Sequence, residues 1–211
     1  MLKVYWANAD ELNMPDPALF SDYRRSKLSA IKPEEPRSAS ACAEMLLIEA
    51  LRREDPSISL PLRVETDAFG KPYLPDSGLC FNLSHSGPYA ACAISDRPLG
   101  LDIQRLTECR EALVRRFFAP REQEHILNAA CRSEAFTRLW CRKESFLKAI
   151  GLGLRLELDS FDVSGADPQL SYEGKDYAFR ETRVGELFFC VCAHKDALPD
   201  GDFPELIRIG G

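Results

Sequence analysis

The sequence predicts an α+β protein made of two similar halves, residues 1–98 and 99–211, which meet near Pro98. In each half, apolar residues at helical spacing are followed by segments that alternate as strands do. A length of 211 residues suits one large domain or two smaller ones, and 45% hydrophobic residues can supply a core for both. No internal sequence repeat marks the two halves.

The first half is expected to open with a strand and two helices. The run LKVYWA alternates as a strand does, and residues 16–31 predict a short helix that Pro33 and Pro36 end. From Arg37 the apolar residues recur at helical spacing until Pro56 stops the second helix.

A β meander is expected next, because short alternating runs are separated by turn sequences. The turns are DAFGKP, Ser86-Gly-Pro and Asp96-Arg-Pro. The predicted strands cover residues 63–66, 79–84, 89–95 and 99–105.

The second half repeats the change from helices to strands. Three helices are predicted near residues 109–117, 120–130 and 132–150, and the last ends at Gly151 and Gly153. Strands are then predicted at 160–163, 177–184 and 186–193.

Composition excludes several classes of protein. The longest apolar run is far shorter than the roughly 20 residues that cross a bilayer, and the N-terminus lacks the order of a signal peptide. Eight cysteines are scattered without a CxxC pair, which argues against a zinc ribbon or a thioredoxin motif and is typical of free thiols in a reducing compartment. We therefore expect a cytoplasmic protein without membrane contact.

Charge is unevenly distributed along the chain. The formal net charge is −6, yet residues 110–155 hold ten basic and five acidic side chains, so this segment carries +5 and the remainder −11. A general nucleic-acid binder is usually basic overall. The segment therefore favours an anionic small ligand or an acidic protein partner, and a solvated helix face is the alternative.

Two segments place polar side chains beside predicted core. In LGLDIQRL, the strand period puts Gly100, Asp102 and Gln104 on one face and the apolar residues on the other. In the helix of residues 132–150, Trp140, Glu144 and Lys148 follow one edge at i, i+4 and i+8. The alternatives are a turn or cap role for the aspartate and a surface ion pair between Glu144 and Lys148. The residues expected to form the buried stripe of this helix are Phe136, Leu139, Phe146 and Ile150.

A third feature is Ser84-His85, which a predicted strand delivers to a Ser-Gly-Pro turn. A Ser-His-Asp hydrolase is disfavoured, since these two residues are adjacent and no GxSxG elbow is present. The sequence also has no Walker A loop, and its GLGL run follows a helix instead of preceding one.

Taken in order, five blocks between Phe69 and Leu154 resemble the Sfp-type 4'-phosphopantetheinyl transferase family. They are FGKPYLP, FNLSHSG, LGLDIQ, FFAPREQEHI and LWCRKESFLKAIGLGL. The two signatures of that family, a GxD strand and a W-x-x-K-E-[AS]-x-x-K helix, correspond to residues 100–102 and 140–148. The resemblance is loose over the first 60 residues.

This resemblance implies a pseudo-dimer within one monomeric chain, with coenzyme A and Mg²⁺ in the cleft between the halves. The implied reaction moves the 4'-phosphopantetheine arm of coenzyme A to a serine of an acyl or peptidyl carrier protein. Asp102 and Glu144 match the metal carboxylates of the family, and Gln104 stands where a third acid is usual, without supplying its charge. Glu144 is further implied as the base, Lys148 as the group near the leaving oxygen, and Lys143 as a contact to substrate or carrier.

Coenzyme A is implied to bind through basic residues of the first half and the GKP and SHS segments. The residues expected to bind it are Arg24, Lys27, Lys32, Arg37, Lys71, Pro72, Ser84, His85 and Lys148. The segment 110–155 is expected to bind an acidic carrier protein, with Phe117 and Phe118 as the apolar, water-excluding centre of that contact.

Two other functions remain open from the sequence. A metal-dependent phosphodiesterase or nuclease uses the same residue types around Mg²⁺. A non-enzymatic module that binds carrier proteins is the other, given the neutral residue at position 104.

Overall fold

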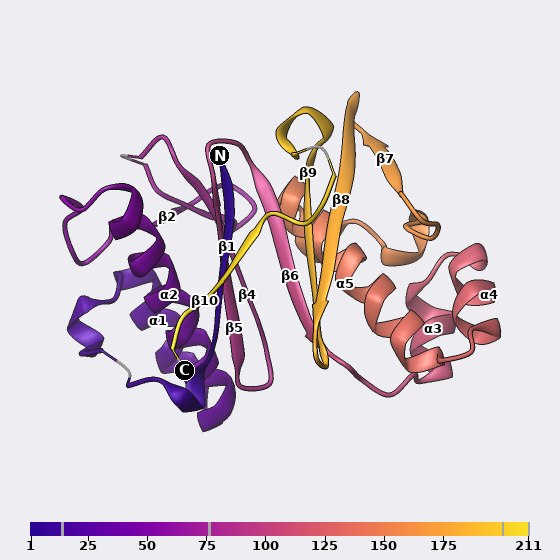
Figure 1. Cartoon of the computed structure of the whole chain (residues 1–211), viewed down its shortest axis with the longest axis horizontal. Helices are drawn as coiled ribbons and strands as arrows, with labels where there is room; N and C mark the ends of the chain where they lie inside the picture. Colours follow the sequence, from indigo (N-terminus) through magenta and orange to yellow (C-terminus); the bar gives the residue numbers. More distant parts are fainter. Residues whose placement is uncertain (14, 76, 200, 211) are drawn as a thin grey trace. The chain divides into compact units, whose positions relative to one another are not determined.

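The computed structural model describes residues 1–13, 15–75, 77–199 and 201–210 (Figure 1). The chain divides into two compact units, Met1–Pro98 with Pro204–Gly211, and Leu99–Phe203. Each unit combines helices with a four-stranded sheet, which confirms the predicted α+β class. The expected second half ran to residue 211, whereas the structure returns residues 204–211 to the first unit.

The first unit contains a sheet with strand order β10-β1-β5-β4. β1 pairs antiparallel with β5 and parallel with β10, and β4 and β5 form an antiparallel hairpin through Gly87, whose φ of +55° suits a glycine. The strands are β1 (Leu2–Asn8), β4 (Cys80–Ser86), β5 (Tyr89–Ser95) and β10 (Glu205–Arg208). The other elements are η1 (Ala9–Glu11), η2 (Pro17–Leu19), α1 (Asp22–Ala30), α2 (Glu34–Glu54) and the small sheet of β2 (Glu65–Thr66) and β3 (Pro72–Tyr73).

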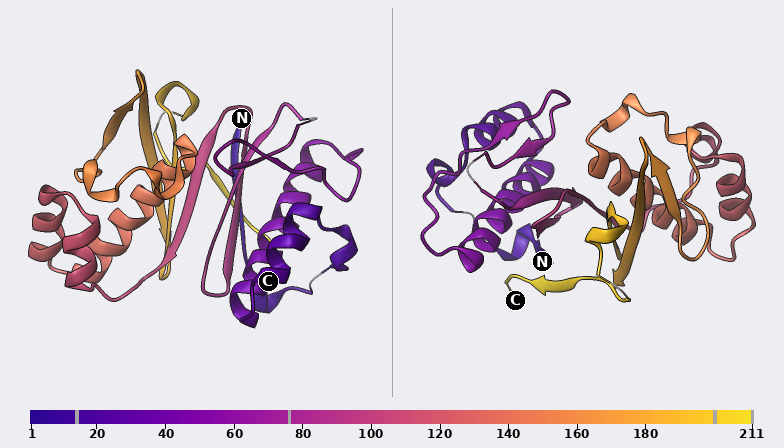
Figure 2. Two further views of the ribbon diagram at one scale, coloured as in Figure 1. Left: turned by 180° about the vertical axis from the view of Figure 1, so that it is seen from behind. Right: turned by 90° about the horizontal axis from the view of Figure 1, so that it is seen from above.

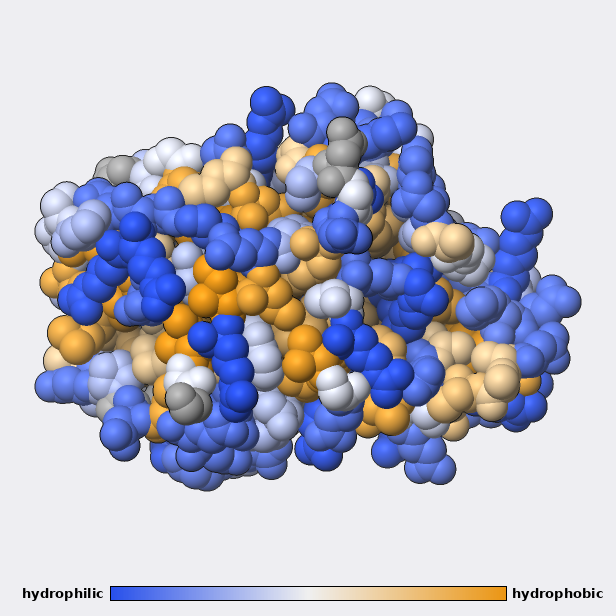
Figure 3. Space-filling view, in the orientation of Figure 1, coloured by the Kyte–Doolittle hydropathy of each residue, from blue (hydrophilic) through white to orange (hydrophobic). Residues whose placement is uncertain are grey.

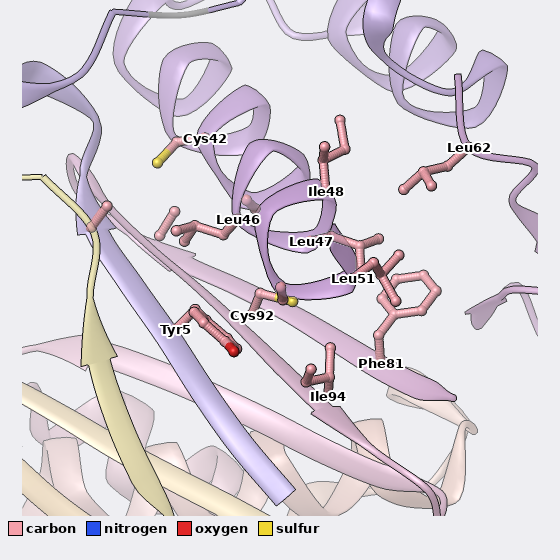
Figure 4. Close-up of a cluster of buried hydrophobic side chains, with 14 of the residues drawn as sticks. Tyr5, Cys42, Leu46, Leu47, Ile48, Leu51, Leu62, Phe81, Cys92 and Ile94 are labelled. Carbon is pink, nitrogen blue, oxygen red and sulfur yellow. The ribbon is translucent and has the colours of Figure 1, made fainter. Parts of the chain in front are cut away.

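The core of the first unit lies between α2 and this sheet. Figure 2 shows α2 on one face of the strands, and Figure 4 shows the buried side chains that fill the space between them. Leu46 and Leu51 of α2 are at most 1% exposed, as are Tyr5 of β1 and Ile94 of β5. Burial of these apolar side chains fixes the strands that carry Ser84 and His85.

Two predictions for the first half are wrong in detail. The second helix begins at Glu34, three residues before the expected start at Arg37, and includes Pro36 in its first turn. Proline is tolerated there because the first N–H groups of a helix have no intrahelical partner. The predicted meander is also broken, because the strand after Pro98 pairs in the other unit. The alternation of apolar and polar residues predicts which side chains share a face of a strand, but it does not predict which strands pair with it.

The second unit contains an antiparallel sheet with strand order β6-β9-β8-β7. Its strands are β6 (Leu99–Arg105), β7 (Gln169–Tyr172), β8 (Lys175–Val184) and β9 (Leu187–His194). Its helical elements are α3 (Glu111–Phe117), α4 (Pro120–Asn128), α5 (Arg132–Ile150), η3 (Gly153–Arg155), η4 (Leu158–Ser160) and η5 (Lys195–Ala197).

α5 packs on β6 and β9 and ends at Gly151, whose φ of +77° is the left-handed C-terminal cap that glycine adopts readily. The strand predicted at 160–163 is wrong, since the 3₁₀ turn η4 leads there into a loop that buries Val163. The strand β7 was not predicted.

The surface mixes hydrophilic and apolar side chains, as the face in Figure 3 shows. Within the described part of the chain, the large apolar side chains that are exposed are Met1, Leu19, Phe69, Tyr73 and Val184. No described helix combines the length and the hydropathy needed to cross a membrane.

Candidate active site

Strand β6 carries the GxD sequence directly beneath helix α5. A Cβ atom added to Gly100 would lie 2.0 Å from the carbonyl oxygen of Ser145 and 2.3 Å from the backbone nitrogen of Ala149. Only glycine allows the two backbones to approach this closely. The glycine therefore sets the distance between the strand and the helix that carry the candidate site residues.

Asp102 is the buried anion of this site, and its residue is 2% exposed. Its Oδ1 accepts a hydrogen bond from Nζ of Lys148 at 2.6 Å, and its Oδ2 accepts one from Nε2 of Gln104 at 2.9 Å. Charge-assisted bonds of this kind hold a carboxylate in a single orientation. Asp102 is thus fixed by one residue of α5 and by its neighbour on β6.

Glu144 stands one helical turn before Lys148 on α5 and is half-buried. Burial is the largest cause that raises the pKa of Glu144, and the charge of Asp102 raises it further, whereas Lys148 lowers it. The negative charge of Asp102 therefore disfavours the ionised form of Glu144, and the ammonium group of Lys148 offsets only part of this repulsion.

The chemistry of these donors suits a hard divalent cation. Mg²⁺ prefers oxygen ligands, uses one or two carboxylates in many sites, and completes its octahedron with water and phosphate oxygens. Asp102 on β6 and Glu144 on α5 are carboxylates that could hold such an ion. Gln104 uses its amide nitrogen toward Asp102, so in this structure it positions that carboxylate.

The structure contradicts the expected role of Lys143 as a contact to substrate or carrier. Its residue is fully buried, and its Nζ lies 2.7 Å from Oε2 of Glu122. The same Nζ donates to the carbonyl oxygens of Leu158 and Phe161, each at 2.7 Å. A step of 100° per residue turns Lys143 away from Glu144 into the core, where it ties α5 to α4 and to the loop after η4.

Trp140 is half-buried, as its place at the edge of the apolar stripe of α5 predicts. Its ring stacks on Phe136 with centroids 6.0 Å apart and meets the edge of Phe117 at 5.7 Å. Trp140 therefore supports the α3–α5 contact next to the site and leaves part of its indole at the surface.

Apart from Lys148 on α5, the residues expected to bind coenzyme A lie in the first unit in different settings. Arg24 is 5% exposed, and its guanidinium donates to Glu44 at 3.1 Å and to Ser40 at 2.6 Å, so it stabilises the α1–α2 contact. Lys27 and Lys32 are exposed, and Nζ of Lys27 lies 4.7 Å from the Tyr23 ring centroid.

Three further places in the first unit hold Arg37, the GKP segment and the SHS segment. Arg37 is exposed on the first turns of α2 and pairs with Glu34. Lys71 closes a turn after Gly70, and Pro72 opens β3. Ser84 is buried and His85 is exposed near the end of β4.

Only part of the basic segment 110–155 is exposed. Phe118, Arg142 and Lys143 are at most 1% exposed, so Phe118 cannot form the water-excluding centre of a docking site as expected. The basic residues that do remain exposed are Arg110, Arg115, Arg116, Arg121, Arg132, Arg138 and Arg155.

Sequence reasoning missed two contacts of the site. It gave an ion pair with Glu144 as the alternative role of Lys148 and did not indicate the hydrogen bond to Asp102, 46 positions away. It also gave no role to Cys141, whose Sγ lies 3.2 Å from the backbone oxygen of Asp102. No local sequence signal indicates either contact, because both depend on how α5 lies on β6.

Comparisons with known proteins agree on one family. The model of the 4'-phosphopantetheinyl transferase superfamily matches residues 98–192, which include β6 and α5. The chain is 32% identical over 163 residues to 4'-phosphopantetheinyl transferase Sfp of Bacillus subtilis. The aligned region covers 75% of this chain and 73% of that protein. It is 41% identical over 112 residues to 4'-phosphopantetheinyl transferase HetI of Nostoc, covering 49% of this chain and 47% of that one. It is also 30% identical over 196 residues to the human L-aminoadipate-semialdehyde dehydrogenase-phosphopantetheinyl transferase, covering 77% and 62%.

Proposed function

Because the chain belongs to the 4'-phosphopantetheinyl transferase superfamily, we propose that it transfers the 4'-phosphopantetheine arm of coenzyme A to a carrier protein. The acceptor is a serine hydroxyl of an acyl or peptidyl carrier protein, and the second product is adenosine 3',5'-bisphosphate. The observation that carries this proposal is the Lys148–Asp102 ion pair beside Glu144, which lies within the matched region. These are the residues that match the two family signatures.

The chemistry assigned to the site is a phosphoryl-type substitution. The serine oxygen forms a bond to the phosphorus that bears pantetheine, and the bond from that phosphorus to the bridging oxygen of the pyrophosphate breaks. Glu144 takes the proton of the hydroxyl, and its raised pKa brings it nearer to the working pH of a base. Lys148 places its ammonium group where the leaving phosphate gathers negative charge.

Asp102 and Glu144 are proposed to hold Mg²⁺. When bound, this ion offsets the charge of the pyrophosphate. Gln104 keeps Asp102 in place through its 2.9 Å hydrogen bond. This assignment rests on the donor chemistry of the two carboxylates and on their mutual repulsion.

Coenzyme A is proposed to use residues of the first unit. Lys71 and Pro72 are assigned to the adenine, and Ser84 with His85 to the ribose 3'-phosphate. The residues proposed for further phosphate contacts are Lys27, Lys32 and Arg37, all of which are exposed. Arg24 is not carried forward, because Glu44 and Ser40 already hold its guanidinium.

The carrier protein is proposed to approach the exposed arginines of α3, of its N-cap and of the first turn of α4. Arg115 and Arg116 lie on α3, and Arg110 and Arg121 flank it. Opposite charge on an acidic carrier would steer the encounter. We also keep the prediction that the chain acts as a cytoplasmic monomer.

One incubation tests the proposed reaction. The protein is mixed with coenzyme A, Mg²⁺ and an apo carrier protein, and the carrier is followed by intact mass. Gain of one phosphopantetheine supports the transferase. Release of nucleotide without that gain would indicate a phosphodiesterase, and neither change would indicate a carrier-binding module.

A further inference from the structure

A cavity of about 500 Å³ lies in the second unit between the first turns of α5 and strands β8 and β9. Its lining does not include Asp102, Gln104, Glu144 or Lys148, and it adjoins the candidate active site only through Cys141, whose Sγ contacts the backbone oxygen of Asp102. Its volume falls within the range of pockets that take small molecules. The proposed reaction leaves this cavity without a role.

The floor of the cavity is apolar and rigidly held. It includes Phe188, Cys141 and Cys190, of which the two cysteines are 1% exposed. Sγ of Cys141 lies 3.6 Å from the carbonyl oxygen of Phe188, and Sγ of Cys190 lies 3.3 Å from Oγ of Ser145. A floor fixed by such contacts is a preformed surface for an apolar or aromatic group.

The rim of the cavity carries two arginines and two glutamates, and the buried Arg142 behind it adds a third guanidinium group. Glu134 and Arg183 pair with each other at 2.7 Å. Glu181 is shared by two arginines, since it accepts from Arg138 at the rim and from the buried Arg142 behind it at 2.7 Å. Two cations on one carboxylate leave a net positive charge, and the side chain of Arg138 is 46% exposed.

We propose that this cavity binds a small molecule with an apolar body and one anionic group, at a site separate from the active site. The apolar body would lie on the floor near Phe188 and Cys190, and the anion would meet Arg138. Arg142 continues to neutralise Glu181 when Arg138 turns to the ligand, so the exchange leaves no buried carboxylate without a partner.

The test uses 8-anilinonaphthalene-1-sulfonate, which has an aromatic body and one sulfonate, and follows its fluorescence on the full chain. Ala135→Trp fills the cavity from the side of α5, and Arg138→Gln removes the rim cation while the Arg142–Glu181 pair remains. Val184→Trp is the control for an added tryptophan, because Val184 is exposed and does not line the cavity. Thermal melting of each variant shows that it is folded.

Saturable binding at one site is expected for the wild type, with affinity weakened at least about tenfold by Ala135→Trp and by Arg138→Gln and unchanged by Val184→Trp. Excess coenzyme A should leave the binding unchanged. Equal binding by all variants, displacement by coenzyme A, or no saturable binding would overturn the proposal. Since transfer is not measured, this result is independent of the proposed reaction.

Discussion

The buried pair of Lys143 and Glu122 offers a sharp test of how α5 is held. Lys143→Met keeps an unbranched side chain, one atom shorter, and removes its charge. Glu122 then retains only the backbone N–H groups of Ala119 and Val163, each at 2.8 Å, in a place that is fully buried. Breaking a buried ion pair on one side costs about 3–5 kcal/mol, because the remaining charge has lost its partner.

Urea unfolding followed by circular dichroism measures this cost. With a slope of roughly 1–3 kcal/mol per molar urea, the midpoint should fall by more than about 1 M. The double variant Lys143→Met with Glu122→Gln leaves no unpaired charge, so it should be more stable than Lys143→Met alone.

The pH dependence of this variant has a defined sign. Burial already raises the pKa of Glu122 above its ordinary value of 4.5, and loss of Lys143 removes the main opposing cause. A carboxyl whose pKa is raised in the folded state favours folding while it is protonated, below its unfolded pKa. Lys143→Met should therefore lose stability as the pH rises from about 4.5 through the raised pKa.

The same variant also separates a structural role from contact with a substrate. Folded Lys143→Met should keep transfer close to the wild-type rate in low-temperature assays, because its ammonium group is buried away from Glu144. An unchanged urea midpoint, or a lost reaction in a protein of unchanged stability, would refute this reasoning.

Three other substitutions test neighbouring parts of the second unit. Gly100→Ala should destabilise the protein by at least about 1–3 kcal/mol in urea unfolding, because its Cβ would lie 2.0 Å from the oxygen of Ser145, and a wild-type midpoint would contradict the close packing. Glu144→Gln should abolish transfer and, without Mg²⁺, raise the melting temperature at pH 7 relative to wild type, since it removes a carboxyl whose pKa is raised by burial; an unchanged melting temperature would refute the stability part. Trp140→Ala should cost less than the about 3–5 kcal/mol of a fully buried aromatic residue, because Trp140 is half-buried, and a larger loss would show a deeper role in the core.

Local pattern predicted the helices and the two signature elements well. The GxD strand and the helix of residues 132–150 appear as β6 and α5. Of the predicted stripe, Phe136, Leu139 and Phe146 are at most 5% exposed, whereas Ile150 at the end of the helix is half-buried. Both elements have a strong apolar period, which depends only on nearby residues.

Pairing across the chain could not be predicted in the same way. β6 was expected beside the preceding strand and instead pairs with β9, and the four-residue strand β10 joins the first unit from the far end of the chain. Strands this short carry little alternation, and their partners depend on long-range packing.

The sequence proposed the residues of the candidate site, but it did not predict which of them contact each other. Asp102, Glu144 and Lys148 do lie together, whereas the donor role of Gln104 and the burial of Lys143 depend on the packing of α5. Residue type alone does not distinguish a lysine that faces a substrate from one that neutralises a buried glutamate.

The most direct test of the central claim compares carboxylate variants in the transfer reaction. Wild type, Asp102→Asn and Glu144→Gln are incubated with coenzyme A, Mg²⁺ and an apo carrier protein, with Asp167→Asn as the control at an exposed aspartate. Intact mass of the carrier is the measurement, and thermal melting confirms that each variant is folded. Wild type and Asp167→Asn should add one phosphopantetheine to each carrier, and the other two variants should add none. Transfer at the wild-type rate by folded Asp102→Asn would contradict the claim that this carboxylate belongs to the catalytic site.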